Sequence, residues 1–295
     1  MDRLDAMHLF VRVAELGSFA AVAQQMGVAR SVVTRQIAGL ENHLGVKLMV
    51  RSTRHLSLTS AGTAYLEKCR VILNLVEAAE TDVAADRQTP RGQIRISLPL
   101  SFGIQRIAPA LLDFCQRFPE ISLDMDYTDN RVKLIEDGID ISIRVSGRLE
   151  PGDVARKLGT AKLHLIASAD YLARHGCPLH PKELSHHECL GYVANGSVIN
   201  WRFMIDGQLE TISVRSRINA NNGEVLTEAV ALGLGISLQP DFVVAPFIEA
   251  GRVQTILDHF LPPELGVYAL LPSNRQVPHR VRVLMEFLAE HLQAT

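Results

Sequence analysis

The stretch from Gly27 to Thr59, GVARSVVTRQIAGLENHLGVKLMVRSTRHLSLT, decides the fold of the N-terminal part of this 295-residue chain. Apolar residues in its first half recur at the spacing of one helical face: Val33, Ile37, Leu40 and Leu44. This spacing predicts a helix from about Arg30 to His43. Two short runs follow, VKLMV and HLSLT, joined by RSTR, and the second alternates apolar and polar residues as a strand does. The stretch therefore predicts a helix followed by a β-hairpin.

Two further helices are expected before this stretch. Residues 5–16 have apolar side chains at helical spacing, and Gly17 is a typical residue to follow a helix end. Ser18 is placed to cap a second helix, SFAAVAQQ, which Gly27 ends. Helices joined by tight turns and followed by a hairpin are typical of a winged helix-turn-helix.

The charges of this region are unbalanced. Residues 1–60 contain seven Lys and Arg and four Asp and Glu, a net charge of +3, whereas the remainder has 23 against 28, a net of −5. A basic head on an acidic body is expected if the head alone meets a polyanion.

The predicted DNA contacts lie on the outward side of the third helix and on the hairpin: Arg30, Ser31, Thr34, Arg35, Arg51, Thr53 and Arg54. Arginine pairs with guanine in the major groove, and short hydroxyls reach phosphates or base edges. Arginines at a hairpin tip suit the flanking backbone or a minor groove. The alternative interpretation is that these residues form a solvated helix face in a helical bundle. The adjacent wing favours the DNA-binding interpretation.

A long helix is predicted after the wing, over about 60–85, with Thr59 as its cap. Its apolar stripe spans roughly six turns with no obvious globular partner in the sequence: Leu66, Cys69, Ile72, Leu73, Val76, Ala79 and Val83. Such a stripe indicates a dimer-forming helix. RQTPRGQ, residues 87–93, then indicates a hinge.

The remaining sequence alternates strand and helix patterns, which predicts an α/β domain with a largely parallel sheet. The expected strands include 93–100, 121–127, 139–145, 161–168, 234–240 and 267–273, and the expected helices include 101–118, 131–138, 169–176, 222–233 and 279–292. Two hundred residues of this pattern favour two lobes with a cleft. The predicted division is residues 1–59 for the winged head, 60–87 for the linker helix and 88–295 for the α/β domain. Lobe I is expected at about 92–161 and 268–295, and lobe II at about 162–267.

Composition limits the class of protein. Hydrophobic residues make up 47% and charged residues 21%, as in ordinary globular chains. Four cysteines lie far apart without C-x-x-C spacing, which argues against a disulfide framework or zinc site. The N-terminus lacks the apolar run of a signal peptide, and no stretch is apolar enough for a membrane span. A cytoplasmic protein that does not contact membranes is expected.

Candidate ligand contacts lie at helix starts and strand ends in the α/β domain: Ser101, Phe102, Arg144, Val145, Ser146, Asn221 and Asn222. A hydroxyl and free N–H groups at a helix start can hold a carboxylate, and open α/β sheets bind ligands at strand ends. Arg144 is open to two interpretations, an anion contact or a pair with Asp140. Phe102 and Trp201 are candidates for an apolar wall, or for core packing.

No catalytic, metal or cofactor motif is found. His180, His186, His187 and Glu188 lack the H-E-x-x-H spacing of a zinc helix, and adjacent histidines point in different directions. G-x-S-x-G, G-x-G-x-x-G and P-loop motifs are absent from the sequence. Two alternatives are a bifunctional enzyme with a DNA-binding head and a solute-binding protein. The sequence offers no nucleophile or acid/base set for the first, and the winged head disfavours the second.

Residues 18–62 closely resemble the DNA-binding head of LysR-type transcriptional regulators, and the wing is most similar to the CrgA-like branch. The residues that carry the resemblance are Ser18, Phe19, Ala23, Ser31, Val33, Thr34, Ile37, Leu40, Glu41, Leu44, Gly45, Leu48, Arg51, Arg54, Leu58, Thr59 and Gly62. Val22 and Met49 depart from the pattern but stay apolar. GQIRISLP, HLIASADYLARHG, ELSHHECLGY and LGLGISLQPDFVV are similar to the family's effector-binding domain.

The resemblance implies a transcription regulator whose C-terminal domain has the fold of periplasmic binding proteins. It implies double-stranded promoter DNA as a partner and a small-molecule effector between the lobes, with anionic and aromatic ligands both open. It also implies self-association as a dimer, tetramer or higher oligomer, with RNA polymerase as a further potential partner. No cofactor is expected, and activation and repression are both open.

Overall fold

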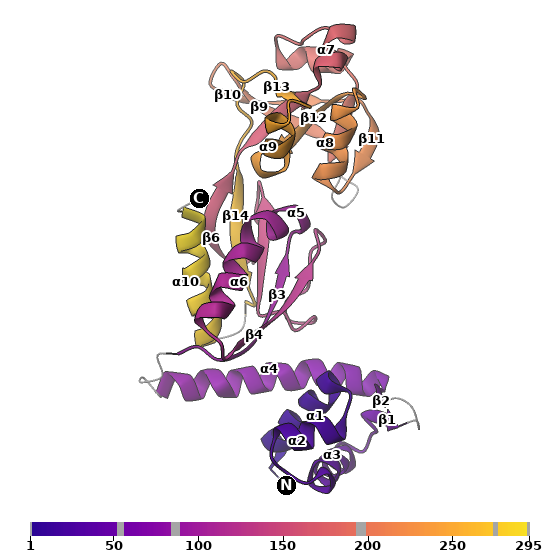
Figure 1. The fold of residues 1–295 in the computed structure, drawn as a ribbon, viewed down its shortest axis with the longest axis vertical. Helices are drawn as coiled ribbons and strands as arrows, with labels where there is room; N and C mark the ends of the chain where they lie inside the picture. Colours follow the sequence, from indigo (N-terminus) through magenta and orange to yellow (C-terminus); the bar gives the residue numbers. More distant parts are fainter. Residues whose placement is uncertain (1, 52–55, 84–88, 193–198, 274–276, 294–295) are drawn as a thin grey trace. The chain divides into compact units, whose positions relative to one another are not determined.

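The computed structural model describes residues 2–51, 56–83, 89–192, 199–273 and 277–293. They form two units, whose elements are coloured along the chain in Figure 1. The first unit runs to Thr89 and includes the described parts of Lys133–Ile139 and Asn274–His279; the second contains the rest. Within the described ranges, none of the helices combines the length and apolar character that crossing a membrane requires.

The first unit begins with three helices, as predicted. Its elements are α1 (Arg3–Leu16), α2 (Phe19–Gln25), α3 (Arg30–Leu44), β1 (Met49–Arg51), β2 (Leu56–Leu58) and α4 (Ser60–Val83). Gly17 follows α1 in the left-handed conformation, with φ of 63°. The Ser18 hydroxyl accepts the N–H of Ala21 and begins α2. The predicted end of a helix at Gly17 and the predicted start of the next helix at Ser18 are both confirmed.

The helix α3 and the hairpin complete a winged helix-turn-helix. Val33, Ile37 and Leu40 of α3 are buried in a core shared with α1 and α2. β1 and β2 pair antiparallel, with Met49 opposite Leu58. The predicted head fold is therefore confirmed.

Part of the apolar stripe on α4 packs into the core of the head, which the sequence did not predict. Leu66, Cys69 and Leu73 are buried in the same core as α1 and α3. The expectation that this stripe has no globular partner is wrong for these three residues, because the start of α4 packs back on the head. Ile72 and Leu75 stay 37% and 42% exposed. The side chains of the stripe at 79 and 83 lie outside the described part of the chain.

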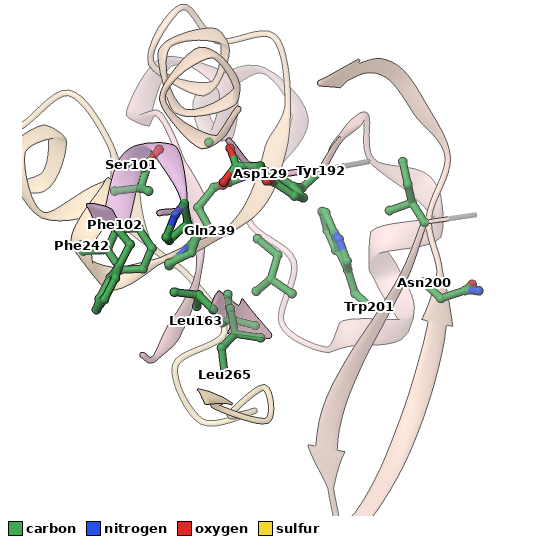
Figure 2. A pocket seen from close by; sticks show the side chains of 17 residues that line it. Ser101, Phe102, Asp129, Leu163, Tyr192, Asn200, Trp201, Gln239, Phe242 and Leu265 are labelled. Carbon is green, nitrogen blue, oxygen red and sulfur yellow. The ribbon is translucent and has the colours of Figure 1, made fainter. Parts of the chain in front are cut away.

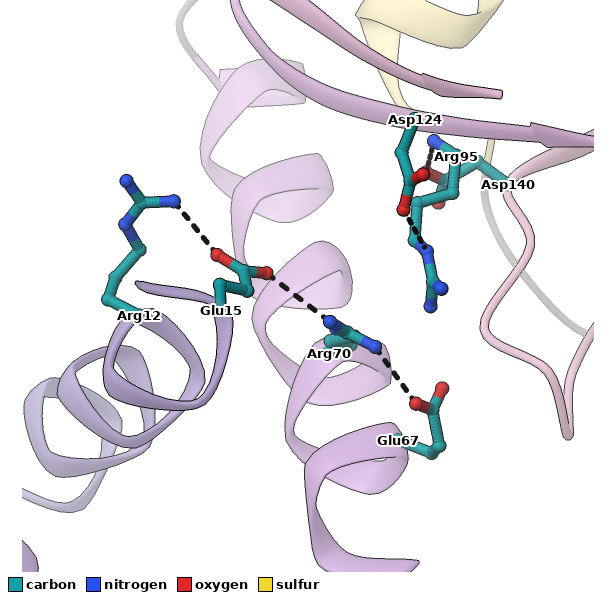
Figure 3. Close-up of polar contacts among 7 residues, drawn as sticks. All are labelled: Arg12, Glu15, Glu67, Arg70, Arg95, Asp124 and Asp140. Atoms are coloured by element: carbon teal, nitrogen blue, oxygen red, sulfur yellow. Dashed lines mark hydrogen bonds and ion pairs between the residues drawn. The ribbon is translucent and has the colours of Figure 1, made fainter. Parts of the chain in front are cut away.

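An ion-pair chain also joins α1 to α4. Glu15 on α1 accepts from Arg12 at 2.8 Å and from Arg70 on α4 at 3.4 Å. Arg70 also pairs with Glu67 at 2.9 Å. Figure 3 shows this chain of contacts from Arg12 to Glu67. Apolar burial and ion pairs together hold the beginning of α4 to the head.

The second unit contains two five-stranded sheets. The first has the order β4-β3-β5-β14-β6. Its strands are β3 (Gly92–Leu98), β4 (Ile121–Tyr127), β5 (Ile141–Ser146), β6 (Val154–Ala161) and β14 (Leu265–Leu271). The helical segments next to it in sequence are α5 (Leu100–Phe102), the π-helix η1 (Gly103–Ile107), α6 (Ala108–Arg117) and α10 (His279–Gln293). α6 and α10 meet through Phe114 and Phe287, whose ring centroids are 5.3 Å apart, beside this sheet in Figure 1.

The second sheet has the order β11-β8-β12-β7-β13. Its strands are β7 (Leu163–Ala167), β8 (Cys189–Tyr192), β11 (Ser216–Ala220), β12 (Ile236–Pro240) and β13 (Gln254–Thr255). A separate hairpin consists of β9 (Asn200–Ile205) and β10 (Gln208–Ser213), and the helices are α7 (Ala169–His175), the 3-10 helix η2 (Pro181–His186), α8 (Gly223–Ala231) and α9 (Asp241–Glu249). Trp201, Phe203 and Ile205 of β9 are buried in one core with Leu165 and Ile236 of this sheet.

Both sheets are mixed, so the prediction of a largely parallel sheet is wrong. β3 pairs parallel with β4 and β5, but β14 pairs antiparallel with β5 and β6. Likewise β12 is parallel to β8 and antiparallel to β7. The reversed strand of the first sheet is β14, on which the chain returns after the second sheet, and the reversed strand of the second sheet is β7, on which the chain enters it. Strand–helix alternation does not reveal these long-range returns.

Three local predictions also differ from the structure. Residues 131–138 are not a helix: Asp137 donates its N–H to the Lys133 carbonyl and accepts the Lys133 N–H on its side chain, closing a single turn. The helix expected at 101–118 contains a π segment, in which the N–H of Ala108 reaches the Gly103 carbonyl. Pro109 supplies no N–H there, which favours the wider spacing. Gly92 and Gln93, expected in the hinge, belong to β3; residues 87–88 lie outside the described part.

Candidate functional site

The outward side of α3 is the first candidate surface. Arg30, Ser31 and Arg35 are exposed, and Thr34 is half-buried. Val33 and Ile37 on the opposite side are 0% and 2% exposed and set the direction of that outward side. Arg30, Ser31 and Arg35 thus lie on the exposed side of the helix, and Thr34 lies at its border.

Two acids of the head, Glu15 and Glu41, are engaged by other cations. Glu15 pairs with Arg12 and Arg70, and Glu41 pairs with Lys47 at 2.6 Å. Within the described part of the chain, neither Arg30 nor Arg35 forms an ion pair. Their charges are available to an external anion.

Glu41 attaches α3 to the wing. Its buried carboxylate accepts the backbone N–H groups of Leu48 at 3.0 Å and Met49 at 3.2 Å. Burial raises the pKa of Glu41, but the hydrogen bonds from Lys47 and from these two N–H groups outweigh burial, so the pKa lies below its ordinary value. The ionised carboxylate therefore stabilises the path from α3 into β1.

The other side of the wing is held by the start of α4. The Thr59 hydroxyl donates to the Lys47 carbonyl at 2.7 Å and accepts the Gly62 N–H at 2.9 Å, which confirms Thr59 as the cap. A Cβ at Gly62 would stand 1.9 Å from the Leu48 carbonyl oxygen. Only glycine allows this close approach of α4 to the strand.

The predicted wing contacts are described only in part. Arg51 is the last residue of β1 and pairs with Leu56, but its side chain lies outside the described residues. Thr53 and Arg54 lie outside them altogether. Their roles stay predictions.

The second unit contains a cavity of about 280 Å³ between residues of its two sheets. Pro99, Ser101, Phe102, Asp129, Val145 and Leu265 line it from the β3–β5–β14 sheet and its connections. The remaining lining residues come from the second sheet, its helices and the hairpin: Leu163, Tyr192, Ile199, Asn200, Trp201, Gly223, Leu238, Gln239, Pro240, Phe242 and Val243. Figure 2 shows these side chains around the cavity. Its size and its mixed apolar and polar lining suit a small organic molecule.

Three of the predicted ligand contacts line this cavity. Ser101 lies at the start of α5 and donates its hydroxyl to the Glu224 carboxylate at 2.5 Å. The Phe102 ring meets Phe242 edge to face, with centroids 5.0 Å apart. Val145, near the end of β5, is the third. Trp201, proposed for an apolar wall, also lines the cavity and is 6% exposed.

The other four predicted contacts are not among the lining residues. Arg144 donates to the Thr128 carbonyl and to the Ser97 hydroxyl, at 2.5 and 3.0 Å. The Ser146 hydroxyl donates to the Arg148 carbonyl. The Asn222 side chain caps α8 by accepting the Val225 N–H, and Asn221 is exposed. The Arg144, Ser146 and Asn222 side chains are thus used within the fold.

Asp140, the alternative partner of Arg144 in the sequence analysis, contacts Arg95, and so does Asp124. Asp140 accepts the Arg95 N–H at 2.9 Å, and Asp124 pairs with the Arg95 guanidinium at 3.0 Å, as Figure 3 shows. The Arg95–Asp124 pair joins neighbouring strands β3 and β4. These carboxylates stabilise the first sheet.

Sequence reasoning missed Asp129, Tyr192 and Gln239, which supply most of the polar lining. Asp129 follows β4, Tyr192 ends β8, and Gln239 is near the end of β12. All three strands pair parallel with a neighbour, and ligands bind at the carboxyl ends of such strands. The same rule that selected Arg144–Ser146 could have found Asp129 and Gln239, whose strands were predicted, and it could have found Tyr192 had β8 been recognised as a strand.

Tyr192 is neutral in this setting. Partial burial, with further contributions from the charges of Asp129 and Glu224, raises the pKa of Tyr192 to about 12. The hydroxyl therefore keeps its proton at neutral pH and can donate or accept a hydrogen bond in the cavity.

The histidine cluster has structural contacts. His187 Nδ1 and the Tyr171 hydroxyl are 3.2 Å apart, and His180 Nδ1 accepts the Lys182 N–H. Among the described residues, no group of three His, Cys, Asp or Glu is placed to hold a metal ion. His180 and His187 help to shape the region of η2 around Tyr171.

A winged helix-turn-helix with available arginines on α3, in one chain with an α/β unit that has a ligand-sized cavity, defines the class of helix-turn-helix transcription regulators. The family of bacterial regulatory helix-turn-helix proteins, lysR family, matches residues 4–63, and the LysR substrate binding domain matches residues 87–293. The chain belongs to the LysR family and is a transcriptional regulator with a DNA-binding and an effector-binding domain.

Relatives resemble the chain over nearly its whole length. An HTH-type transcriptional regulator of Xanthomonas campestris is 37% identical over 96% of this chain and 84% of the relative. The HTH-type transcriptional regulator CrgA of Neisseria meningitidis is 34% identical over 98% of this chain and 96% of its own length. The expected similarity to CrgA is confirmed. Both relatives are named transcriptional regulators.

Solved structures of full-length regulators have a similar fold. The structure of CrgA from Neisseria meningitidis, described as a LysR-type transcriptional regulator, has a TM-score of 0.61 at 34% identity and covers 98% of both chains. The full-length Vibrio cholerae virulence activator AphB has a TM-score of 0.60 at 28% identity and covers 98% of this chain and 99% of that one. The predicted fold class is thereby confirmed.

Proposed function

We propose that α3 enters the major groove of promoter DNA and that the wing contacts the flanking backbone. Arg30 and Arg35 provide the cations, and Ser31 and Thr34 provide short hydroxyls on the same side. Arg51, Thr53 and Arg54 provide the contacts of the wing. The observation that carries the proposal is that Arg30 and Arg35 are exposed and form no ion pair within the described residues, while Glu15 and Glu41 of the same unit pair with other cations.

The effector binds in the 280 Å³ cavity in this proposal. Ser101, Phe102 and Val145 are retained from the sequence prediction, and Asp129, Tyr192 and Gln239 are added to the polar lining. The cavity is lined from both sheets, so a bound molecule contacts both at once. A ligand with different affinity for two arrangements of these sheets shifts the population between them.

The proposed domain division keeps residues 1–59 as the head, 60–87 as the linker helix and 88–295 as the effector-binding domain. The start of the C-terminal part of lobe I moves from 268 to 265, where β14 begins. Self-association through α4 uses the apolar side chains that the head leaves exposed, Ile72 and Leu75. The proposal includes no catalytic step, because a regulator of this kind needs only to bind its effector.

Selection of duplexes from fragmented genomic DNA by the purified full-length protein tests the DNA-binding proposal. Wild type is expected to enrich a common sequence, and Arg35→Ala is expected to lose that enrichment while keeping weak, salt-sensitive binding. Arg117→Ala, which removes an exposed arginine from α6, is the matched control and is expected to behave as wild type. Unchanged enrichment by Arg35→Ala would contradict the placement of α3.

A further inference from the structure

The charge of the cavity lining is negative. Asp129 is the one Asp, Glu, Lys or Arg among the described residues that line it. Glu224 lies close enough to accept the hydroxyl of the lining residue Ser101. Residues 193–198, which connect the lining residues Tyr192 and Ile199, contain no charged residue in their sequence. An anion entering the cavity meets carboxylates.

The groups that were expected to hold a ligand carboxylate already hold protein carboxylates. The N–H of Leu100, at the start of α5, donates to Asp129 at 3.1 Å. The Ser101 hydroxyl and the Gln105 amide both donate to Glu224, at 2.5 and 3.2 Å. A ligand carboxylate would have to displace Asp129 or Glu224 to gain these donors.

The nearby cation Arg144 is likewise engaged. Its guanidinium donates to the Thr128 carbonyl and the Ser97 hydroxyl. Burial lowers the pKa of Arg144, and the charges of Asp129 and Asp126 oppose that shift. The guanidinium of Arg144 is therefore held by groups of the fold itself, and the charges of Asp129 and Asp126 favour its ionised form.

The side-chain oxygen of Gln239 is a hydrogen-bond acceptor to which none of the described residues donates. Its side chain is fully buried and lines the cavity, and its Nε2 donates to the Ser237 hydroxyl at 2.8 Å. Ser237 in turn donates its single hydroxyl proton to the Leu190 carbonyl at 2.9 Å. Because that proton is used, Ser237 can only accept from Gln239, so the amide NH₂ faces Ser237 and Oε1 faces away from it.

Gln239 Oε1 has no hydrogen-bond partner within the described part of the chain. A Cβ placed on Gly223, another lining residue, would stand 2.8 Å from this oxygen, so the acceptor lies at the cavity wall. A buried amide oxygen left unpaired is costly, and a donor on a bound molecule would remove that cost.

The remaining wall is apolar and contains several rings. Phe102, Trp201 and Phe242 line the cavity together with leucines such as Leu163 and Leu265. Figure 2 shows Gln239 between the side of Phe102 and Phe242 and the side of Asp129 and Tyr192. A ligand with an apolar ring and one polar end fits this division.

We infer that the cavity selects an aromatic compound whose polar end is a hydrogen-bond donor, an amine or a hydroxyl, and discriminates against carboxylates, with Gln239 Oε1 as the acceptor and Asp129 as the source of the charge preference. This inference rests on the proposed function, in which the cavity is the effector site. It names the chemical class of the effector that the sequence left open between anionic and aromatic ligands.

Calorimetric titration of the full-length protein with four compounds of one skeleton tests the inference: 2-phenylethylamine, 2-phenylethanol, ethylbenzene and phenylacetate. The amine and the alcohol are expected to bind, with phenylacetate and ethylbenzene each at least about tenfold weaker. Phenylacetate binding as tightly as the alcohol would overturn the charge preference, and equal binding of ethylbenzene and the alcohol would overturn the role of the donor. Binding of none of the four at millimolar concentration would overturn the inference as a whole.

Two variants assign the preference to residues. Gln239→Leu is expected to remove the preference for phenylethanol over ethylbenzene, and Asp129→Asn to reduce the preference for the amine over phenylacetate about tenfold. Each comparison is a ratio measured on one protein. If Gln239→Leu does not fold, the Asp129→Asn ratio decides, and an unchanged ratio would overturn the inference.

DNA selection by the same wild-type preparation distinguishes failure of this inference from failure of the proposed function. Sequence enrichment without binding of any compound contradicts the ligand class alone, whereas absence of enrichment contradicts the proposed function.

Discussion

The carboxylate of Glu41 on α3 and the backbone N–H of Leu48 at the entrance to β1 are joined by a hydrogen bond of 3.0 Å. The same oxygen accepts the Met49 N–H, and the other oxygen accepts Lys47 Nζ. One buried side chain of the DNA-contacting helix therefore orders three consecutive residues that lead into the wing. The position of the wing relative to α3 depends on this carboxylate.

Glu41→Gln is expected to lower the free energy of unfolding of the head by about 1–3 kcal/mol, because hydrogen bonds to an ionised acceptor are lost or weakened. Denaturant unfolding of the full-length variant measures the change, and hydrogen exchange of the Leu48 and Met49 amides locates it. Asp5→Asn, an exposed acid of α1, is the control and should leave both measurements unchanged. Unaltered amide exchange at 48 and 49 would contradict the role of Glu41.

The stability that Glu41 contributes is expected to depend on pH. Its pKa lies below the ordinary value of 4.5, so the folded state binds the proton less readily than the unfolded chain. The contribution is then fully present above about pH 4.5 and is lost as the pH falls through the lower pKa of the folded state. The difference in unfolding free energy between wild type and Glu41→Gln, measured from pH 7 downward, should shrink only below this value. A difference that is constant over the whole range would argue against an ionised carboxylate.

Gly62→Ala is expected to destabilise the contact between α4 and the wing by about 1–3 kcal/mol, because the new Cβ would overlap the Leu48 carbonyl oxygen and force the backbone apart. Thermal unfolding of the full-length protein measures the loss. Gly159→Ala is the matched control, since a Cβ there meets nothing within 4 Å and its φ is not in the left-handed region. Equal effects of the two substitutions would mean that loss of glycine flexibility, and not the overlap, is responsible.

Local signals explain why the head could be predicted from the sequence. Gly17 and Ser18 mark the junction of α1 and α2 by their own backbone and side-chain chemistry, and Thr59 caps α4 in the same way. Each signal acts within a few residues of itself. Their order along the chain was enough to define the winged fold.

Long-range pairing explains what could not be predicted. β14 pairs with β5 although more than one hundred residues separate them, and no local pattern records that pairing or its antiparallel direction. Arg144 and Asn222 were chosen as ligand contacts, but the Arg144 guanidinium donates within the fold and the Asn222 side chain accepts the Val225 N–H. The orientation of the Gln239 amide follows from the hydrogen bond that Ser237 donates to the Leu190 carbonyl. Only the three-dimensional structure reveals this hydrogen bond.

Trp201 is the single tryptophan of the chain and lines the cavity, so its fluorescence should report ligand binding. A compound that enters the cavity is expected to change the emission intensity, because it alters the surroundings of the buried ring. Phe203→Tyr, on the same strand but outside the lining, is a control that keeps the signal. Binding detected by calorimetry without any change in Trp201 emission would place the ligand elsewhere.

Leu75→Glu is expected to weaken self-association at least about tenfold, because it puts a charge into the apolar side of α4 that the head leaves uncovered. Leu66, Cys69 and Leu73, which hold α4 to the head, are unchanged by the substitution, so the head should keep its thermal stability. Light scattering across a concentration series measures the molar mass, and Lys68→Glu, an exposed position on the same helix, is the control for added charge. Two linked heads bind neighbouring sites more tightly than one, so DNA affinity should fall together with the molar mass. A variant that keeps its molar mass but loses DNA affinity would show that Leu75 acts on the head itself and that self-association uses another surface.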